Sequence, residues 1–152
     1  MIEEVKRTTR HFNRLTQIVG KKNIGIEIES PFDFISIANE GITATIIRNF
    51  MESFKIPLGT TAELLDISEP TLYRWFKSNK TLDRNFSVKL LDIIDLFVFG
   101  AEVFEGQENF LKWIDLANTA IGGLKPKELI EIPGGISKVK DLLGRIEYGV
   151  YS

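Results

Sequence analysis

The stretch TTAELLDISEPTLYRWFK, residues 60–77, has the pattern of two short helices joined by a tight turn. The first helix is predicted to end near Asp66. Ser68 is placed to cap the second helix, because its hydroxyl accepts an orphan backbone N–H of the first turn. Pro70 follows in that turn, where a missing N–H costs nothing. Ala62 is small where the second helix must pass closely. Four apolar side chains are expected to pack where the helices cross steeply: Leu65, Ile67, Leu72 and Trp75.

This spacing resembles that of the DNA-binding helix-turn-helix, whose second helix enters the major groove. Such turns often carry Gly where this chain has Asp66, so Asp66 either adopts a left-handed conformation, which Asp tolerates better than most residues, or lengthens the turn. Arg74 and Lys77 would then reach a guanine edge or a phosphate. The residues predicted to face DNA are Ser68, Glu69, Thr71, Tyr73, Arg74 and Lys77. The alternative is an ordinary pair of core helices that share one hydrophobic corner.

The composition is that of a globular protein, with 43% hydrophobic and 26% charged residues in a chain of 152. This length suits one domain, or a small domain with a docked module. The chain has no Cys, which excludes disulfide frameworks and thiolate chemistry. No apolar run reaches membrane-spanning length, and charges occupy the N-terminus where a signal peptide needs a hydrophobic core. We therefore expect a cytoplasmic protein.

The net charge of −2 argues against nucleic-acid binding, but the charges are unevenly distributed. Residues 68–90 carry a local balance of +3, whereas residues 91–120 carry −5. DNA binding needs a local basic face rather than a basic chain. A monomer with so few basic residues would bind weakly, so the sequence predicts a homodimer that uses two half-sites.

Hydrophobic spacing predicts an all-α fold, with a helix-turn-helix core followed by a small helical C-terminal domain. We divide the chain into residues 1–40, a helical segment without an assigned role; residues 41–90, the DNA-binding region; and residues 91–152, the C-terminal domain. Within the first segment, residues 24–29 are expected to be an extended linker, and Ser30 is expected to cap the next helix.

The most apolar stretch of the chain runs from Phe86 to Phe104 and is hydrophobic nearly all round, which indicates a helix buried on more than one side. Asp92 and Asp95 inside it argue against a membrane span. Two interpretations stay open: a central helix that bridges the two halves of the chain, or a dimer contact. Further helices are predicted over residues 105–118, 126–130 and 136–148.

Several C-terminal motifs occur in a particular order: FVFG at 97–100, Trp113, NTAIGGLKPKELI at 118–130 and PGGISKVKDLLGRIEYGVYS at 133–152. This order resembles the C-terminal toxin-binding domain of the Xre/MbcA/ParS antitoxins. Together with the upstream helix-turn-helix, the resemblance covers residues 40–152.

The resemblance implies an antitoxin of a type II toxin–antitoxin pair, whose cognate toxin is typically a RES-domain enzyme that depletes cellular NAD. It also implies binding to promoter DNA through the helix-turn-helix. The last helix and tail would cover the toxin active site, through Arg145, Glu147, Tyr148, Val150, Tyr151 and Ser152. Tyr and Arg are common interface anchors, and this fits that role. The alternative is that Tyr148 and Tyr151 fold back on the chain's own core.

Two other function classes fit the sequence less well than the antitoxin. An enzyme is disfavoured, because His11 is the only histidine and no metal-ligand spacing, phosphate-binding glycine loop or nucleophile elbow occurs, so neither a catalytic residue nor a cofactor is predicted. A stand-alone transcriptional regulator would use its C-terminal half for dimerisation, but such a domain has no need of the polar, aromatic extension EYGVYS. An antitoxin whose helix-turn-helix no longer binds DNA also stays open, because Glu69 lies in the row predicted to face the groove.

Overall fold

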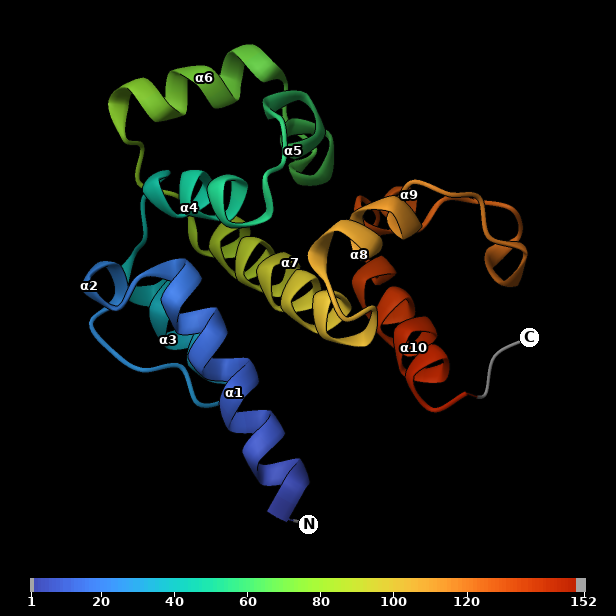
Figure 1. The fold of residues 1–152 in the computed structure, drawn as a ribbon. Coiled ribbons are helices and arrows are strands. Elements are labelled where there is room, and N and C mark those ends of the chain that lie inside the picture. The colour runs from blue at the N-terminus through green and yellow to red at the C-terminus, as the bar shows by residue number, and fades with distance from the viewer. Residues whose placement is uncertain (1, 150–152) are drawn as a thin grey trace.

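The computed structural model describes residues 2–149, and within this range the chain is built from helices, with no β-strand (Figure 1). The predicted all-α class is thus confirmed. The α-helices are α1 (Ile2–Val19), α2 (Lys21–Ile24), α3 (Asp33–Glu40), α4 (Thr45–Phe54), α5 (Leu58–Leu65), α6 (Glu69–Ser78), α7 (Arg84–Val103), α8 (Gln107–Ile114), α9 (Pro126–Ile130) and α10 (Gly135–Glu147), and a 3₁₀ turn covers Thr119–Ile121.

Helix α7 runs through the centre of the molecule, where it packs against α1, α3, α8 and α10 (Figure 1). Asp83 caps its N-terminus, since the Asp83 carboxylate accepts the backbone N–H of Phe86 at 2.8 Å. Ten of its residues are buried, from Ser87 to Gly100. The interpretation of this stretch as a central helix that joins the two halves is therefore confirmed. The predicted division after residue 90 falls inside α7, so this helix belongs to both parts.

Phenylalanine rings connect the N-terminal and C-terminal halves through one continuous core. The Phe97 ring of α7 lies 5.0 Å from Phe50 and 5.4 Å from Phe54 of α4, between ring centroids. On its other side it lies 5.1 Å from Phe110 of α8, and all four rings are fully buried. Edge-to-face contacts of this kind add to the free energy gained from burial alone. The hydrophobic core beneath α5 and α6 is thus continuous with the core of the C-terminal helices.

The N-terminal segment differs in part from the prediction. The linker expected over residues 24–29 is only partly present, because Ile24 ends α2, Gly25 is left-handed, and only residues 27–29 lack helix and bend. Ile28 within it is buried, with its N–H donated to the Thr16 hydroxyl at 3.0 Å. Ser30, however, does not cap the next helix. Helix α3 begins at Asp33, whose carboxylate accepts the N–H groups of Glu29 and Ser30. The Asp33 side chain therefore holds the segment that enters α3, and among the described residues no side chain caps the N–H groups of this helix.

Two boundaries nearer the centre of the chain also differ. Helix α5 begins at Leu58 and includes Gly59, which was expected to end the preceding helix. Helix α8 ends at Ile114, four residues earlier than predicted, because Asn118 pairs with Leu124 and closes a short loop instead. None of the helices in residues 2–149 is long and apolar enough to span a membrane.

Candidate functional site

The turn between α5 and α6 has the local geometry that the sequence predicts. Asp66 adopts a left-handed conformation with φ of 55°, and its N–H is donated back to the carbonyl of Glu63. Ser68 caps α6, because its hydroxyl oxygen accepts the N–H of Thr71 at 3.2 Å. Both local predictions are confirmed. Ala62, Leu65 and Leu72 are buried in the corner between the helices, so α5 holds α6 on the molecular surface.

The six side chains predicted to face DNA lie on the outer side of α6, where all are exposed except the half-buried Thr71. Several of them contact one another: Arg74 donates to the Thr71 hydroxyl at 3.2 Å, and the Lys77 ammonium lies 5.7 Å from the Tyr73 ring centroid. These contacts hold two cations on one outer surface without burying them. The arrangement presents donors to solvent and leaves them free for a ligand.

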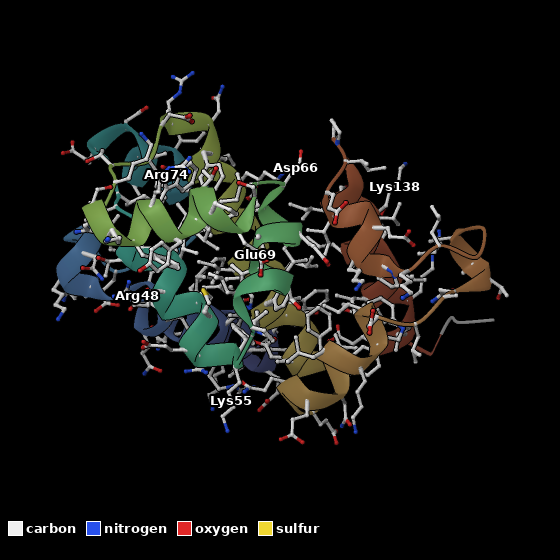
Figure 2. The ribbon with its side chains drawn as sticks, turned by 90° about the horizontal axis from the view of Figure 1, so that it is seen from above. Arg48, Lys55, Asp66, Glu69, Arg74 and Lys138 are labelled. Carbon is white, nitrogen blue, oxygen red and sulfur yellow. The ribbon has the colours of Figure 1, made fainter. Side chains whose placement is uncertain are left out.

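Charge changes sign along α6 (Figure 2). Toward its C-terminus, Arg74 and Lys77 are joined by Lys80 and by Arg48 of α4, whose guanidinium lies 4.8 Å from the Phe76 ring centroid. At its N-terminus, a cavity of about 660 Å³ is lined by four carboxylates: Glu63, Asp66, Glu69 and Glu131. Burial raises the pKa of Glu131, and the charges of Asp66 and Glu63 raise it further. The basic half of α6 is thus the half suited to a polyanion.

The C-terminal helices form a compact unit, in which two glycines allow close packing. Gly100 of α7 faces the Phe110 ring, and Gly135 at the start of α10 lies against the backbone of Leu129 in α9. Between them, Asn118 accepts the N–H of Ala120 at 2.8 Å and opens the 3₁₀ turn. The predicted helix at residues 126–130 is confirmed as α9. The contact at Gly135 holds the N-terminal end of α10 against α9.

The residues predicted to bind a toxin divide into three groups. Arg145 is exposed, and Tyr148 is 73% exposed, so Tyr148 does not fold back on the core. Glu147 behaves differently: its side chain is 16% exposed and pairs with Arg7 of α1. Val150, Tyr151 and Ser152 lie outside the described residues. The last turn of α10 thus presents one cation and one aromatic ring, while its carboxylate is engaged within the chain.

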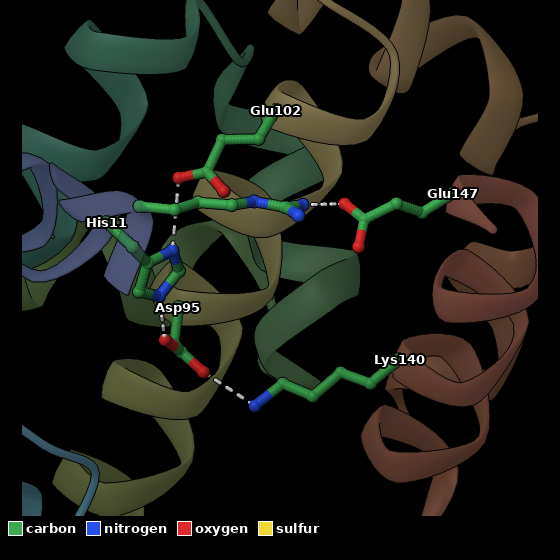
Figure 3. A network of polar contacts seen from close by, with 6 residues as sticks. His11, Asp95, Glu102, Lys140 and Glu147 are labelled. Atoms are coloured by element: carbon green, nitrogen blue, oxygen red, sulfur yellow. Dashed lines mark hydrogen bonds and ion pairs between the residues drawn. The ribbon is translucent and has the colours of Figure 1, made fainter. Parts of the chain in front are cut away.

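Sequence reasoning did not find a polar cluster where α1, α7 and α10 meet (Figure 3). His11 lies at its centre, with Nε2 at 2.5 Å from an Asp95 carboxylate oxygen and Nδ1 at 3.2 Å from Glu102. Lys140 donates to the other Asp95 oxygen at 2.6 Å. Burial by itself would lower the pKa of His11, but its hydrogen bonds to the two carboxylates outweigh burial and raise it to about 9. His11 is therefore a cation at neutral pH.

Asp95 depends on the same partners. Burial would raise the pKa of this carboxyl, but the hydrogen bond to His11 and the Lys140 ammonium hold it below its usual value. A usable signal was present in the sequence, because Arg7 and His11 are four residues apart, and Asp95 and Glu102 are seven apart. Each spacing puts both residues on one helix face. The sequence did not indicate that these faces of α1 and α7 contact each other.

Comparisons with known proteins agree with the C-terminal motifs. Residues 100–149 match the antitoxin Xre/MbcA/ParS C-terminal toxin-binding domain, which corresponds to the end of α7, α8, α9 and α10. The chain is also 21% identical over 132 residues to a "Prs ADP-ribosylating antitoxin" of Sphingobium sp. (strain YBL2), which covers 81% of this chain and 83% of that protein. Residues 100–149, which include the exposed end of α10, thus resemble a toxin-binding domain, and both matches support an antitoxin of the Xre/MbcA/ParS type.

Proposed function

We propose that this antitoxin neutralises an NAD-consuming toxin of the RES class by covering its active site with the end of α10 and the tail that follows. The observation that carries the proposal is the exposure of Tyr148, at 73%, beside the exposed Arg145 in the last turns of the toxin-binding domain. A large ring and a guanidinium held in solvent by a well-packed helix are typical interface anchors. The antitoxin acts by stoichiometric occlusion and not by catalysis.

The use of NAD by the toxin has two sources of support. The C-terminal motifs resemble antitoxins whose partners deplete NAD. The Sphingobium relative is named an ADP-ribosylating antitoxin, and ADP-ribosyl transfer takes its ADP-ribose from NAD. A toxin that hydrolyses NAD and one that transfers ADP-ribose both have a nucleotide pocket, in which Tyr148 provides an apolar ring with a polar tip.

The test is to express the adjacent reading frame alone and together with this chain, while growth, the NAD pool and protein-linked ADP-ribose are followed. Growth arrest with NAD loss, both reversed by this chain, supports the proposal. If ADP-ribosylated protein appeared while the NAD pool stayed constant, the toxin would be an ADP-ribosyltransferase rather than an enzyme that depletes NAD. No toxicity would favour a stand-alone regulator whose C-terminal half serves dimerisation. The variant Tyr148→Ala is expected to lose neutralisation, while Lys138→Ala, an exposed position elsewhere on α10, keeps it.

We further propose that the same protein represses its own operon as a homodimer, through residues 41–90. The support is the capped α6 with Arg74 and Lys77 exposed on its outer side, and the neighbouring Arg48 and Lys80. Two copies of so small a basic surface are needed for a stable complex, because phosphate contacts supply most of the affinity. The carboxylates at the other end of α6 require that DNA engage the C-terminal half of this helix. Absence of promoter binding by the full-length chain would leave an antitoxin whose helix-turn-helix has lost this role.

A further inference from the structure

Six charged side chains, with His11 among them, form a circuit of ion pairs that links three helices, in which Arg7 and His11 are connected only through the α1 backbone (Figure 3). Starting on α10, Glu147 pairs with Arg7 of α1, and His11, one turn further along α1, pairs with Asp95 of α7. Asp95 then pairs with Lys140, which returns the circuit to α10. Glu102 pairs with His11 from the side. Three cations and three anions balance, so the cluster is neutral overall when His11 is protonated.

The helix α10 is held at two points by this circuit. Lys140 and Glu147 are seven residues apart and so lie on one face, about two turns from each other. Between α1 and α10 lies a groove of about 480 Å³, lined in part by Phe12 and Phe99. The polar pairs therefore connect the two helices across a space that backbone packing does not close.

The burial of the circuit distinguishes it from ordinary surface ion pairs, which contribute little to stability. Each pair has a largely buried member: the side chains of Asp95, His11 and Glu147 are 8%, 14% and 16% exposed, whereas those of Lys140 and Arg7 are 35% and 42% exposed. Removing one member of a buried pair leaves an uncompensated charge, which is strongly unfavourable. The orientation of α10 relative to α7 is thus coupled to the presence of α1.

We propose that α1, which lies outside the matched toxin-binding domain, is a positioning element for toxin neutralisation. Arg7 and His11 hold α10 in the orientation in which Arg145 and Tyr148 reach the toxin. This inference rests on the proposed role of the end of α10. It assigns a function to the N-terminal segment, and it makes Glu147 a residue that orients the helix rather than one that contacts the toxin.

The first test is a charge swap, with affinity measured by calorimetry between purified antitoxin and the toxin encoded beside it. Arg7→Glu and Glu147→Arg are each expected to weaken binding by about tenfold or more, and the double variant is expected to restore most of it. Lys6→Glu is the matched control, since it makes the same charge change at the neighbouring exposed position and is expected to bind normally. Failure of the double variant to rescue binding would overturn the inference, because direct toxin contacts by Arg7 and Glu147 would not survive the swap.

The second test reads the helix orientation without any toxin. The chain has no Cys, so Arg10→Cys and Asp141→Cys place a single pair of spin labels at exposed positions of α1 and α10. Pulsed dipolar spectroscopy is expected to give a narrow distance distribution that broadens in Arg7→Glu and narrows again in the swap. An unchanged distribution in Arg7→Glu would also overturn the inference. Thermal unfolding verifies that each variant is folded, which the buried Leu15, Ile18 and Val19 of α1 should ensure.

The two proposals fail in different ways. If Tyr148→Ala and Arg145→Ala bind toxin normally while the spin-label result holds, the proposed contact surface is wrong and α1 only braces α10. If those variants lose binding while Arg7→Glu binds normally, the contact surface stands and the positioning role of α1 is wrong.

Discussion

Gly100 of α7 lies against the ring of Phe110 in α8, so that a Cβ at residue 100 would come within 2.2 Å of Phe110 Cε1. Real side chains do not approach so closely. Phe110 is fully buried between Phe97 and the aromatic side chains of Phe104 and Trp113, so its ring has little room to move away. The segment that matches the toxin-binding domain, residues 100–149, therefore begins at a position where the packing requires glycine.

The first prediction concerns the packing of Gly100 against Phe110. Gly100→Ala is expected to lower the free energy of unfolding by about 1–3 kcal/mol, because overpacking the core outweighs the better helix propensity of Ala. Gly144→Ala in α10 is the control: its Cβ would meet nothing within 4 Å, so it is expected to gain up to about 1 kcal/mol. Urea denaturation measures both. Equal stability of the two variants would contradict the packing argument.

A pH dependence follows from His11. Its pKa is about 9 in the folded chain against 6.5 ordinarily, so its stabilising contribution is complete below pH 6.5 and is lost as pH rises to 9. The charged groups facing it or joined to it are Asp95 and Glu102 of α7, Lys140 and Glu147 of α10, and Arg7 of α1. The loss amounts to on the order of 3 kcal/mol.

Urea denaturation between pH 6 and 9.5 measures this effect against His11→Gln, which keeps a hydrogen-bond donor without the charge. The variant is expected to be less stable than the native chain at pH 6 and nearly as stable at pH 9.5. Parallel stability curves for the two proteins would show that His11 does not carry the dependence.

The left-handed conformation of Asp66 gives a prediction about the α5–α6 turn. Asp66→Gly is expected to raise the free energy of unfolding by up to about 1 kcal/mol, since Gly has no Cβ penalty at φ of 55°. Asp66→Ala keeps the positive φ in a residue type that tolerates it less well than Asp, and is expected to be destabilised. Thermal unfolding separates the two. Both substitutions remove one carboxylate from the cavity beside α6, so we expect both to strengthen promoter binding if α6 enters DNA.

The DNA interface is tested through its salt dependence. Arg74→Ala and Lys77→Ala are each expected to weaken promoter binding and, if the cation meets a phosphate, to reduce the slope of log K against log salt by about 1. Lys138→Ala, an exposed cation on α10 and remote from α6, is the control and should leave the slope unchanged (Figure 2). Fluorescence anisotropy with labelled promoter DNA at several salt concentrations provides the measurement. Unchanged affinity together with identical slopes for all three variants would remove α6 from the interface.

The sequence by itself determined the features that depend on neighbouring residues. The Ser68 cap, the left-handed Asp66, the helix that starts at Pro126 and the apolar α7 all follow from local backbone chemistry and hydrophobic spacing. The same holds for the C-terminal motifs, whose order along the chain was enough to indicate an antitoxin. These properties can be predicted without knowing which helices pack against one another.

Only the tertiary structure decided which charged residues meet. Arg7 and Glu147 are 140 residues apart, and His11 and Asp95 are 84 apart, so no local spacing connects them. The pairs form because α7 packs on both α1 and α10, which brings three separate polar helix faces to one place. There, hydrogen bonds to Asp95 and Glu102 raise the pKa of His11 against the effect of burial. The pairing with Arg7 removes Glu147 from the exposed surface, since a desolvated charge is stable only beside its partner.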